Sequence, residues 1–435
     1  MSVPPRGHSQ AGAQRRQGPG ALAIGASATG VGLLASAAAL AVGARTMARS
    51  PLVPQRTGRP DVVVRAVHAD RLHVDATDET RRPGVLALRQ GGGAVHVRLG
   101  DVIGEPTPTT VARPILAYDT PAHATIGPAS TNGFFWAGDP RTSHALEFSD
   151  VAVPSPVGDL PAWLTLGSAD ADALDGTWAI LVHGHGATRG EALRIIPLLH
   201  RLGMTSLTVA YRNDLVSPPS ADGLYHLGSD EWEDIDAVIA YALARGARRV
   251  VLIGWSMGGG IVLRTSVRSR HRDAIAALVL DSPAVDWHSI LDHHAVQARA
   301  PWPLRALAFR MMAARWGSGA LRLDVPLALG EMNAAFYTEN LAHRALVIHA
   351  GQDATVPLGP SVELGTARPD LIDLEVWPGA THTREWNVDP ARYEERVARF
   401  LADALDAPEL AARLDDRPVR DPASPPQADS TGERL

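Results

Sequence analysis

A single serine stands in a pattern suited to nucleophilic chemistry. Residues 254–258 read GWSMG, so glycines stand two positions before and two positions after Ser256. The apolar run Val250–Ile253 precedes this segment, and a further Gly-Gly-Ile-Val follows it. In this G-x-S-x-G pattern a serine sits on a sharp turn from strand to helix, and the glycines let the two elements approach. The pattern predicts that Ser256 is a nucleophile; the alternative is a glycine-rich turn with an incidental serine.

A serine hydroxyl is a weak nucleophile without a base, and histidine commonly serves as that base. When the nucleophile occupies this kind of turn, the acid and then the histidine follow it along the chain. His382 lies in a loop after the last apolar run, and Asp353 follows the run that ends at His349. Asp281, directly after another apolar run, is the rival acid. We predict that Ser256, Asp353 and His382 form a catalytic triad.

The tetrahedral intermediate of acyl transfer also needs donors for its oxyanion. Residues 183–186 read HGHG and follow the apolar run Trp178–Val182. One backbone N–H is expected from this loop and a second from the residue after the nucleophile. We therefore expect the N–H groups of His185 and Met257 to form an oxyanion hole. The two histidines would alternatively suggest a metal site, but the spacing of further ligands does not favour one.

These segments together resemble the α/β-hydrolase superfamily. The resemblance lies in the HGHG loop, the Tyr-Arg-Asn at 211–213, the GWSMGG turn, the D-A-T-V-P segment at Asp353 and the loop at His382. It covers about residues 145–405 and is strongest to serine aminopeptidase-like and prolyl-oligopeptidase-like hydrolases, along with membrane-attached α/β-hydrolase-domain proteins. It implies a mostly parallel central sheet with helices on both faces, an acyl-enzyme intermediate, and no metal or organic cofactor. It does not define the substrate, because the superfamily holds esterases, lipases, thioesterases and peptidases.

Two further segments would bear on substrate choice. Tyr211 and Arg212 follow the end of an apolar run and so face the predicted site, where Arg212 would bind a substrate carboxylate. A structural, hydrogen-bonded turn is the alternative interpretation of this pair. The stretch from Asp281 to Leu341 is rich in Ala, Arg and Trp and has room for a helical lid.

The surrounding pattern divides the chain into regions. From residue 145 to 407, short apolar runs alternate with helical stretches, one of them predicted over Thr188–Leu202; this alternation is typical of a parallel sheet with crossover helices. Residues 61–144 carry short strand-like runs separated by Gly and Pro, which predict a small β-rich domain. Residues 408–435, rich in Pro, Asp, Ser and Arg, predict a disordered tail.

Residues 1–60 form a leader with a hydrophobic segment and a linker. Residues 17–44 contain no charged side chain, and crossing a bilayer takes about 20 residues. The length of this segment favours an N-terminal membrane anchor. Arginines flank it on both sides, so the orientation of the anchor is undetermined. A signal peptide cleaved near Val42-Gly43-Ala44, followed by export, and a disordered Ala/Gly-rich leader are the alternatives.

Composition excludes several functional classes. The chain has no cysteine, which rules out disulfides, thiolate metal sites and a cysteine nucleophile. A formal net charge of -6 over 435 residues gives no basic excess for nucleic acid. Three hypotheses remain: a serine hydrolase acting on small acyl esters, a serine peptidase acting on short peptides, and a catalytically silent binding module. A peptidase needs carboxylates for a free amine, for which Asp214 and Glu231 are the candidates.

Overall fold

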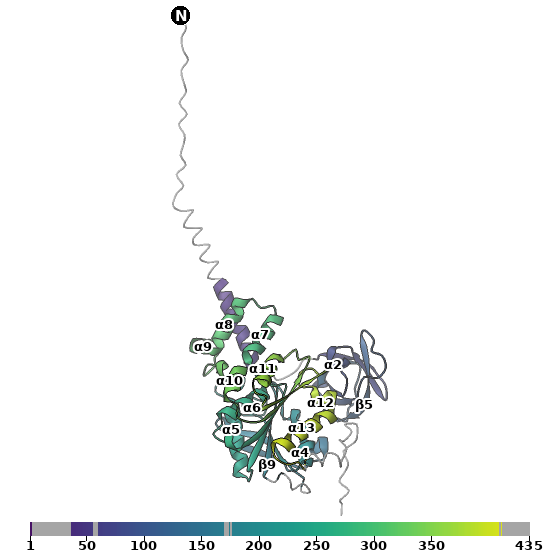
Figure 1. Ribbon diagram of the computed structural model, residues 1–435. Helices are drawn as coiled ribbons and strands as arrows, with labels where there is room; N and C mark the ends of the chain where they lie inside the picture. Colours follow the sequence, from purple (N-terminus) through teal and green to yellow (C-terminus); the bar gives the residue numbers. More distant parts are fainter. Residues whose placement is uncertain (2–35, 55–59, 169–173, 175, 409, 411–435) are drawn as a thin grey trace, which may run out of the picture.

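The computed structural model describes residues 1, 36–54, 60–168, 174, 176–408 and 410. A helix over residues 36–49, here called the N-terminal helix, precedes two folded units (Figure 1). Most of the predicted hydrophobic segment, residues 17–35, and nearly all of the predicted tail lie outside the described residues. Within the described residues, no helix is both long enough and apolar enough to cross a membrane.

The first unit is a closed six-stranded barrel with the strand order β1-β2-β5-β4-β3-β6. Alternate apolar side chains, such as Leu72 and Val74, point inward and form a separate small core. A glycine-rich turn at residues 91–93, with positive φ at all three positions, joins two of its strands. The elements are β1 (Val62–Val67), β2 (Arg71–Asp75), α2 (Asp78–Arg81), β3 (Leu86–Gln90), β4 (Val95–Leu99), β5 (Thr110–Tyr118) and β6 (Gly127–Asn132).

The second unit is built on an eight-stranded sheet with the order β14-β13-β12-β11-β9-β10-β8-β7. Six strands, β9 to β14, are parallel, and β8 and β7 extend the sheet antiparallel at one edge. The strands are β7 (Phe148–Ser155), β8 (Gly158–Thr165), β9 (Thr177–Val182), β10 (Thr205–Val209), β11 (Arg249–Trp255), β12 (Ile275–Asp281), β13 (Ala345–Ala350) and β14 (Ile372–Trp377).

Both faces of this sheet are buried, which explains why its strands are continuous apolar runs. In β9, Ile180 and Val182 belong to the core under α5 and α6, while Ala179 and Leu181 belong to the core under α4 and α13. The covering helices are α4 (Ile196–Arg201), α5 (Trp232–Ala244), α6 (Met257–Arg268), α10 (Ala334–Asn340), α11 (Gly359–Ala367), α12 (Glu385–Val388) and α13 (Pro390–Ala404), and α3 (Pro140–His144) connects the barrel to this unit.

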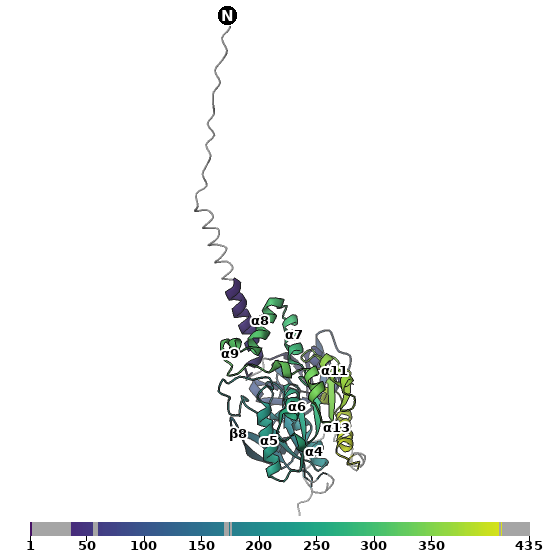
Figure 2. The same cartoon turned by 60° about the vertical axis from the view of Figure 1, so that its left-hand side comes forward.

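Three helices between β12 and β13 stand above the rest of the unit and are here called the lid. They are α7 (Trp287–Gln297), α8 (Trp302–Ala313) and α9 (Arg315–Leu321). The N-terminal helix lies beside α8 and α9 in both views (Figures 1 and 2). Its Arg45 Nε donates to the carbonyl of Ala320 at 2.8 Å, and Ala44 and Ala48 are buried against the body.

Candidate active site

Ser256 occupies a strained turn between β11 and α6, with φ 53° and ψ -120°. A Cβ atom added to Gly254 would lie 2.5 Å from the carbonyl oxygen of Gly258. A Cβ added to Gly258 would lie 2.1 Å from the carbonyl oxygen of Val182. Both contacts are sterically impossible, so the close approach of strand and helix requires glycine at both positions. The Ser256 N–H is held by the carbonyl of Asp281 at 2.9 Å, which fixes the turn.

Two side chains from separate loops meet the serine. Nε2 of His382 lies 2.8 Å from Oγ of Ser256, and Nδ1 of His382 lies 2.7 Å from Oδ2 of Asp353. His382 belongs to the loop after β14, and Asp353 belongs to the loop after β13. All three residues therefore lie at the carboxyl ends of parallel strands, where open α/β sheets bind their ligands. This arrangement can move a proton from the serine hydroxyl to the imidazole.

The carboxylate beside His382 is held in its ionised form. The side chain of Asp353 is fully buried, and its Oδ1 accepts the N–H groups of Thr355 and Val356 at 2.8 Å each. Burial alone would raise the pKa of Asp353, but hydrogen bonds to His349 and His382 hold it below its usual value. The rival acid, Asp281, instead accepts the buried hydroxyl of Tyr393 at 2.9 Å.

The loop after β9 lies directly against the nucleophile, because a Cβ on Gly184 would stand 3.1 Å from the Cβ of Ser256. The Gly184 N–H is taken by Glu191 Oε2 at 2.8 Å. Met257 is the first residue of α6, so its N–H lies at the helix N-terminus. Among the hydrogen bonds of the described residues, none uses the backbone N–H of His185 or of Met257. These two N–H groups are thus free to receive a ligand.

Comparison with known families matches two parts of the chain. Residues 180–350 match the family described as serine aminopeptidase, S33. This stretch includes Ser256 and the HGHG loop, whereas Asp353 and His382 lie beyond its end. This match and the fold identify the second unit as an α/β-hydrolase domain. The protein is a hydrolase. Residues 63–131, which form the barrel, match a family described as a domain of unknown function (DUF8805). A search of the curated proteins found no match.

Several solved structures are similar to this α/β-hydrolase. The esterase Pf2001 of Pyrococcus furiosus is 19% identical, with 62% of this chain and 96% of that chain covered and a TM-score of 0.47. Est1E from Butyrivibrio proteoclasticus is 18% identical, covering 59% of this chain and 99% of that chain at a TM-score of 0.44. A putative aryl esterase from Burkholderia cenocepacia is 20% identical, covering 59% of this chain and all 100% of that chain at a TM-score of 0.41.

The two predicted pocket residues of the hydrolase have other partners. Arg212 is buried and makes two hydrogen bonds of 2.9 Å to the Asp234 carboxylate, from Nε and from Nη2. The hydroxyl of Tyr211 donates to the carbonyl of Gly184 at 3.0 Å. Since its guanidinium is already occupied, Arg212 is not available for a substrate carboxylate. These contacts favour the alternative interpretation, in which the segment is a structural turn supporting the loop after β9.

One contact of the hydrolase site comes from the barrel. Glu79, on α2, accepts hydrogen bonds from Thr381 and Arg384 at 3.1 Å each, and these residues flank His382. Burial alone would raise the pKa of Glu79, but the charges of Arg384 and Arg82 lower it to about 2. Sequence reasoning missed this carboxylate, because no local pattern connects it with a loop that lies 302 residues away.

A cavity of about 340 Å³ lies between the barrel and the hydrolase sheet. Trp136 and Trp163 form part of its wall, and Thr188, in the loop that follows the HGHG segment, closes another side. Its volume is at the lower end of the range for small-molecule sites. Among the described residues, no group of three or more potential ligands is arranged to hold a metal ion.

Proposed function

We propose that this α/β-hydrolase cleaves carboxylic esters through an acyl-enzyme intermediate. Ser256 attacks the acyl carbon, His382 takes the serine proton and returns it to the leaving alcohol, and Asp353 orients the imidazole and stabilises its charged form. In the second half of the reaction, His382 takes a proton from a water molecule, which attacks the acyl carbon. The carboxylic acid then leaves, and His382 returns the proton to Ser256. The observation that carries the proposal is the chain of short contacts from Ser256 Oγ through His382 to Asp353.

The proposed oxyanion donors are the backbone N–H groups of His185 and Met257. Supporting this role, both groups lack other partners among the described residues. Met257 directly follows the serine, and the loop that carries His185 approaches the serine at Gly184. Loss of one such donor typically lowers kcat by about 100- to 1000-fold. Because the donors are backbone groups, replacing the side chain of either residue tests them poorly, and the supporting loop is the better target.

A peptidase that binds a free amine is the second candidate, and the observed contacts disfavour it. Asp214 accepts hydrogen bonds from His183 at 2.6 Å and from Tyr225 at 3.0 Å. Glu231 is buried, and its two oxygens accept the N–H groups of His226 and Gly228 at 2.7 Å each. Both candidate carboxylates therefore already accept hydrogen bonds from the protein, and neither is available to bind the free amine of a substrate. A silent binding module, the third candidate, would have no need of the strained serine geometry.

Attachment to a membrane through residues 17–44 remains part of the proposal, with export after signal cleavage as its alternative. The motivation is the uncharged stretch, most of which lies outside the described residues. Fractionation of the full-length protein with membranes, and its resistance to extraction by high salt, would support an anchor. Recovery of uncleaved protein in the soluble fraction would remove this part of the proposal.

The test of substrate class is a panel of p-nitrophenyl esters of increasing acyl length beside aminoacyl p-nitroanilides, assayed with wild type and Ser256→Ala. We expect ester turnover that Ser256→Ala abolishes, and slower or absent amide turnover. Faster turnover of the aminoacyl anilides by wild type would replace the esterase assignment with a peptidase. Turnover of neither set, from a folded protein, would favour the silent module.

A further inference from the structure

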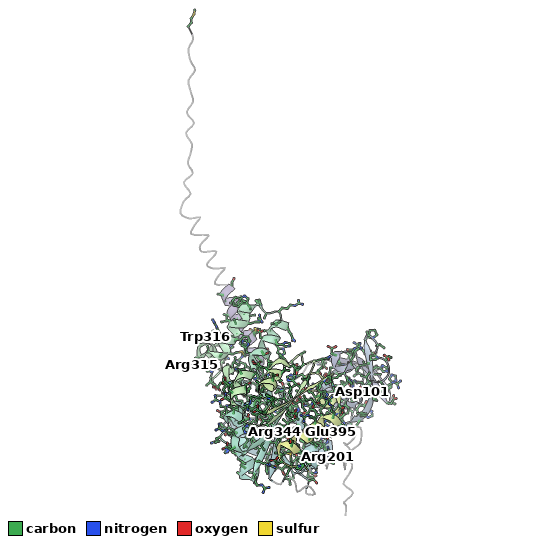
Figure 3. The ribbon with its side chains drawn as sticks, viewed as in Figure 1. Asp101, Arg201, Arg315, Trp316, Arg344 and Glu395 are labelled. Atoms are coloured by element: carbon green, nitrogen blue, oxygen red, sulfur yellow. The ribbon has the colours of Figure 1, made fainter. Side chains whose placement is uncertain are left out.

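The lid carries large apolar side chains that face solvent. Trp302, at the start of α8, is 72% exposed, and Trp316, on α9, is 60% exposed. Figure 3 shows Trp316 and its neighbour Arg315 at the outer edge of the lid, on the side where the N-terminal helix lies. Val296, at the end of α7, is 54% exposed, and Val42 of the N-terminal helix is 66% exposed. Large exposed apolar side chains on the lid and on the helix packed against it are the kind of feature that marks an interaction surface.

The same surface is strongly basic. Residues 296–323 contain five arginines and no acidic residue, although the whole chain has a formal net charge of -6. Four of these arginines lie exposed on the surface: Arg299, Arg310, Arg315 and Arg322. Among the described residues, none of these four forms an ion pair. A second copy of this surface would carry the same charge, so it is an unfavourable partner.

The N-terminal helix joins this surface to the uncharged segment. A Cβ on Gly43 would lie 2.9 Å from the side chain of Leu304 on α8, so the helix packs closely on the lid. Arg45 and Arg49 donate to the carbonyls of Ala320 and Leu321 on α9. The described part of this helix, residues 36–49, projects away from the body of the molecule (Figure 1). The chain that precedes Ser36 is the uncharged stretch from residue 17.

We propose that α8, α9 and the N-terminal helix form one surface that docks on a bilayer containing anionic phospholipids. Tryptophan rings favour the interface between headgroups and acyl chains, where their apolar body and polar N–H are both satisfied. Arginines near that interface are attracted by anionic headgroups. The exposed Trp302 and Trp316 and the four unpaired arginines lie on or next to α8 and α9, and the N-terminal helix packs on the same two helices. This inference concerns the surface and does not depend on the proposed catalytic activity.

Docking in this way would orient the hydrolase on the bilayer. His293 and His294, on α7, donate to the carbonyls of Ala354 and Thr355 at 3.0 and 2.9 Å, in the loop that carries Asp353. The lid therefore lies between the proposed membrane surface and the carboxyl ends of the sheet. The opposite end of the sheet, marked by Leu166 after β8, would face the aqueous phase, because β8 runs antiparallel to β10.

The absence of cysteine makes a direct test possible, since a single introduced cysteine labels one site. Ala320→Cys on α9 and Leu166→Cys at the far end of the sheet both give exposed sites in the full chain. Each is labelled with an environment-sensitive nitrobenzoxadiazole probe and added to vesicles of phosphatidylcholine and phosphatidylglycerol. We expect a blue shift and quenching by doxyl-labelled lipid at position 320, and no change at position 166.

Two variants on the Ala320→Cys background separate docking from simple tethering. Trp302→Ser with Trp316→Ser, and Arg310→Glu with Arg315→Glu, should each abolish the shift, and vesicles of phosphatidylcholine alone should give a smaller one. The proposal is overturned if the full chain does not bind vesicles, or if the probe at position 320 stays in water while the chain is bound. It is also overturned if the tryptophan variant keeps the full shift.

Discussion

Nε2 of His183 lies 2.6 Å from Oδ2 of Asp214, and this buried pair ties the loop after β9 to the loop after β10. Nδ1 of His183 donates to the carbonyl of Gly184 at 3.0 Å, so both ring nitrogens act as donors. Burial alone would lower the pKa of His183, but the charge and hydrogen bond of Asp214 raise it. A charged imidazole therefore supports the loop that carries the proposed oxyanion donor His185.

The first prediction concerns this pair. Because the folded-state pKa of His183 is raised, its stabilising effect is full below the unfolded pKa of about 6.5 and is lost as pH rises through the folded value. Asp214→Asn should remove that pH dependence, lower the free energy of unfolding by about 3 kcal/mol and reduce ester turnover. Urea unfolding at a series of pH values between 6 and 10 measures the free energy of unfolding and its pH dependence. Asp150→Asn, at an exposed carboxylate that pairs with Arg189, is the control and should change little. Equal effects of both variants would contradict the assignment.

The second prediction concerns Gly258, the glycine two positions after the nucleophile. Gly258→Ala would place a Cβ 2.1 Å from the Val182 carbonyl oxygen, so β9 and α6 must separate. We expect a loss of more than about 3 kcal/mol in the free energy of unfolding and loss of ester turnover. Gly319→Ala, on α9 with open space around it, is the matched control. It should be neutral or stabilise by up to about 1 kcal/mol. A stable, active Gly258→Ala protein would be incompatible with the close approach of β9 and α6 behind the turn at Ser256.

The third prediction distinguishes the two candidate acids. Asp353→Asn should lower kcat by roughly 10,000-fold, because the amide no longer holds the imidazole in the required tautomer. Steady-state kinetics with a p-nitrophenyl ester, on protein whose circular dichroism matches the wild type, measures the effect. The assignment of Asp353 fails if this variant retains near wild-type kcat. It also fails if a folded Asp281→Asn protein shows the larger loss.

The fourth prediction gives the barrel a positioning role. Glu79→Gln removes the charge that holds Arg384 and Thr381 around His382, so kcat should fall while KM changes little. The pKa of Glu79 is depressed to about 2, so its stabilising effect is present above the unfolded pKa, about 4.5, and is lost as pH falls toward 2. The variant should lack this acid slope in unfolding experiments. Glu147→Gln, at an exposed pair with Arg141, should leave kcat and the slope unchanged.

The elements of the sheet could be read from the sequence because each buried strand is an apolar run with its own local signature. The run Val250–Ile253 and the glycines beyond it identify the turn at Ser256 without any tertiary information. The predicted helix over Thr188–Leu202 is instead two pieces, a 3-10 helix (Arg189–Arg194) and α4. Pro197 explains the break, since it has no N–H to continue the hydrogen-bond ladder.

Long-range contacts were beyond prediction. Arg212 follows a strand end in the sequence, which suggested a substrate role, but its partner Asp234 lies on the next helix and only the fold reveals the pairing. The contact of Glu79 with the His382 loop likewise depends on how the barrel packs against the hydrolase unit. The closure of the barrel depends on which strands pair, which an alternating pattern does not specify.

The most direct test of the central claim is labelling with a fluorophosphonate probe, followed by intact-mass and peptide analysis. The account predicts one adduct per chain, located on Ser256, with labelling lost in folded Ser256→Ala and strongly slowed in folded His382→Ala. A folded wild type that is not labelled would contradict the account. So would labelling that persists in Ser256→Ala, because another nucleophile would then carry the reaction.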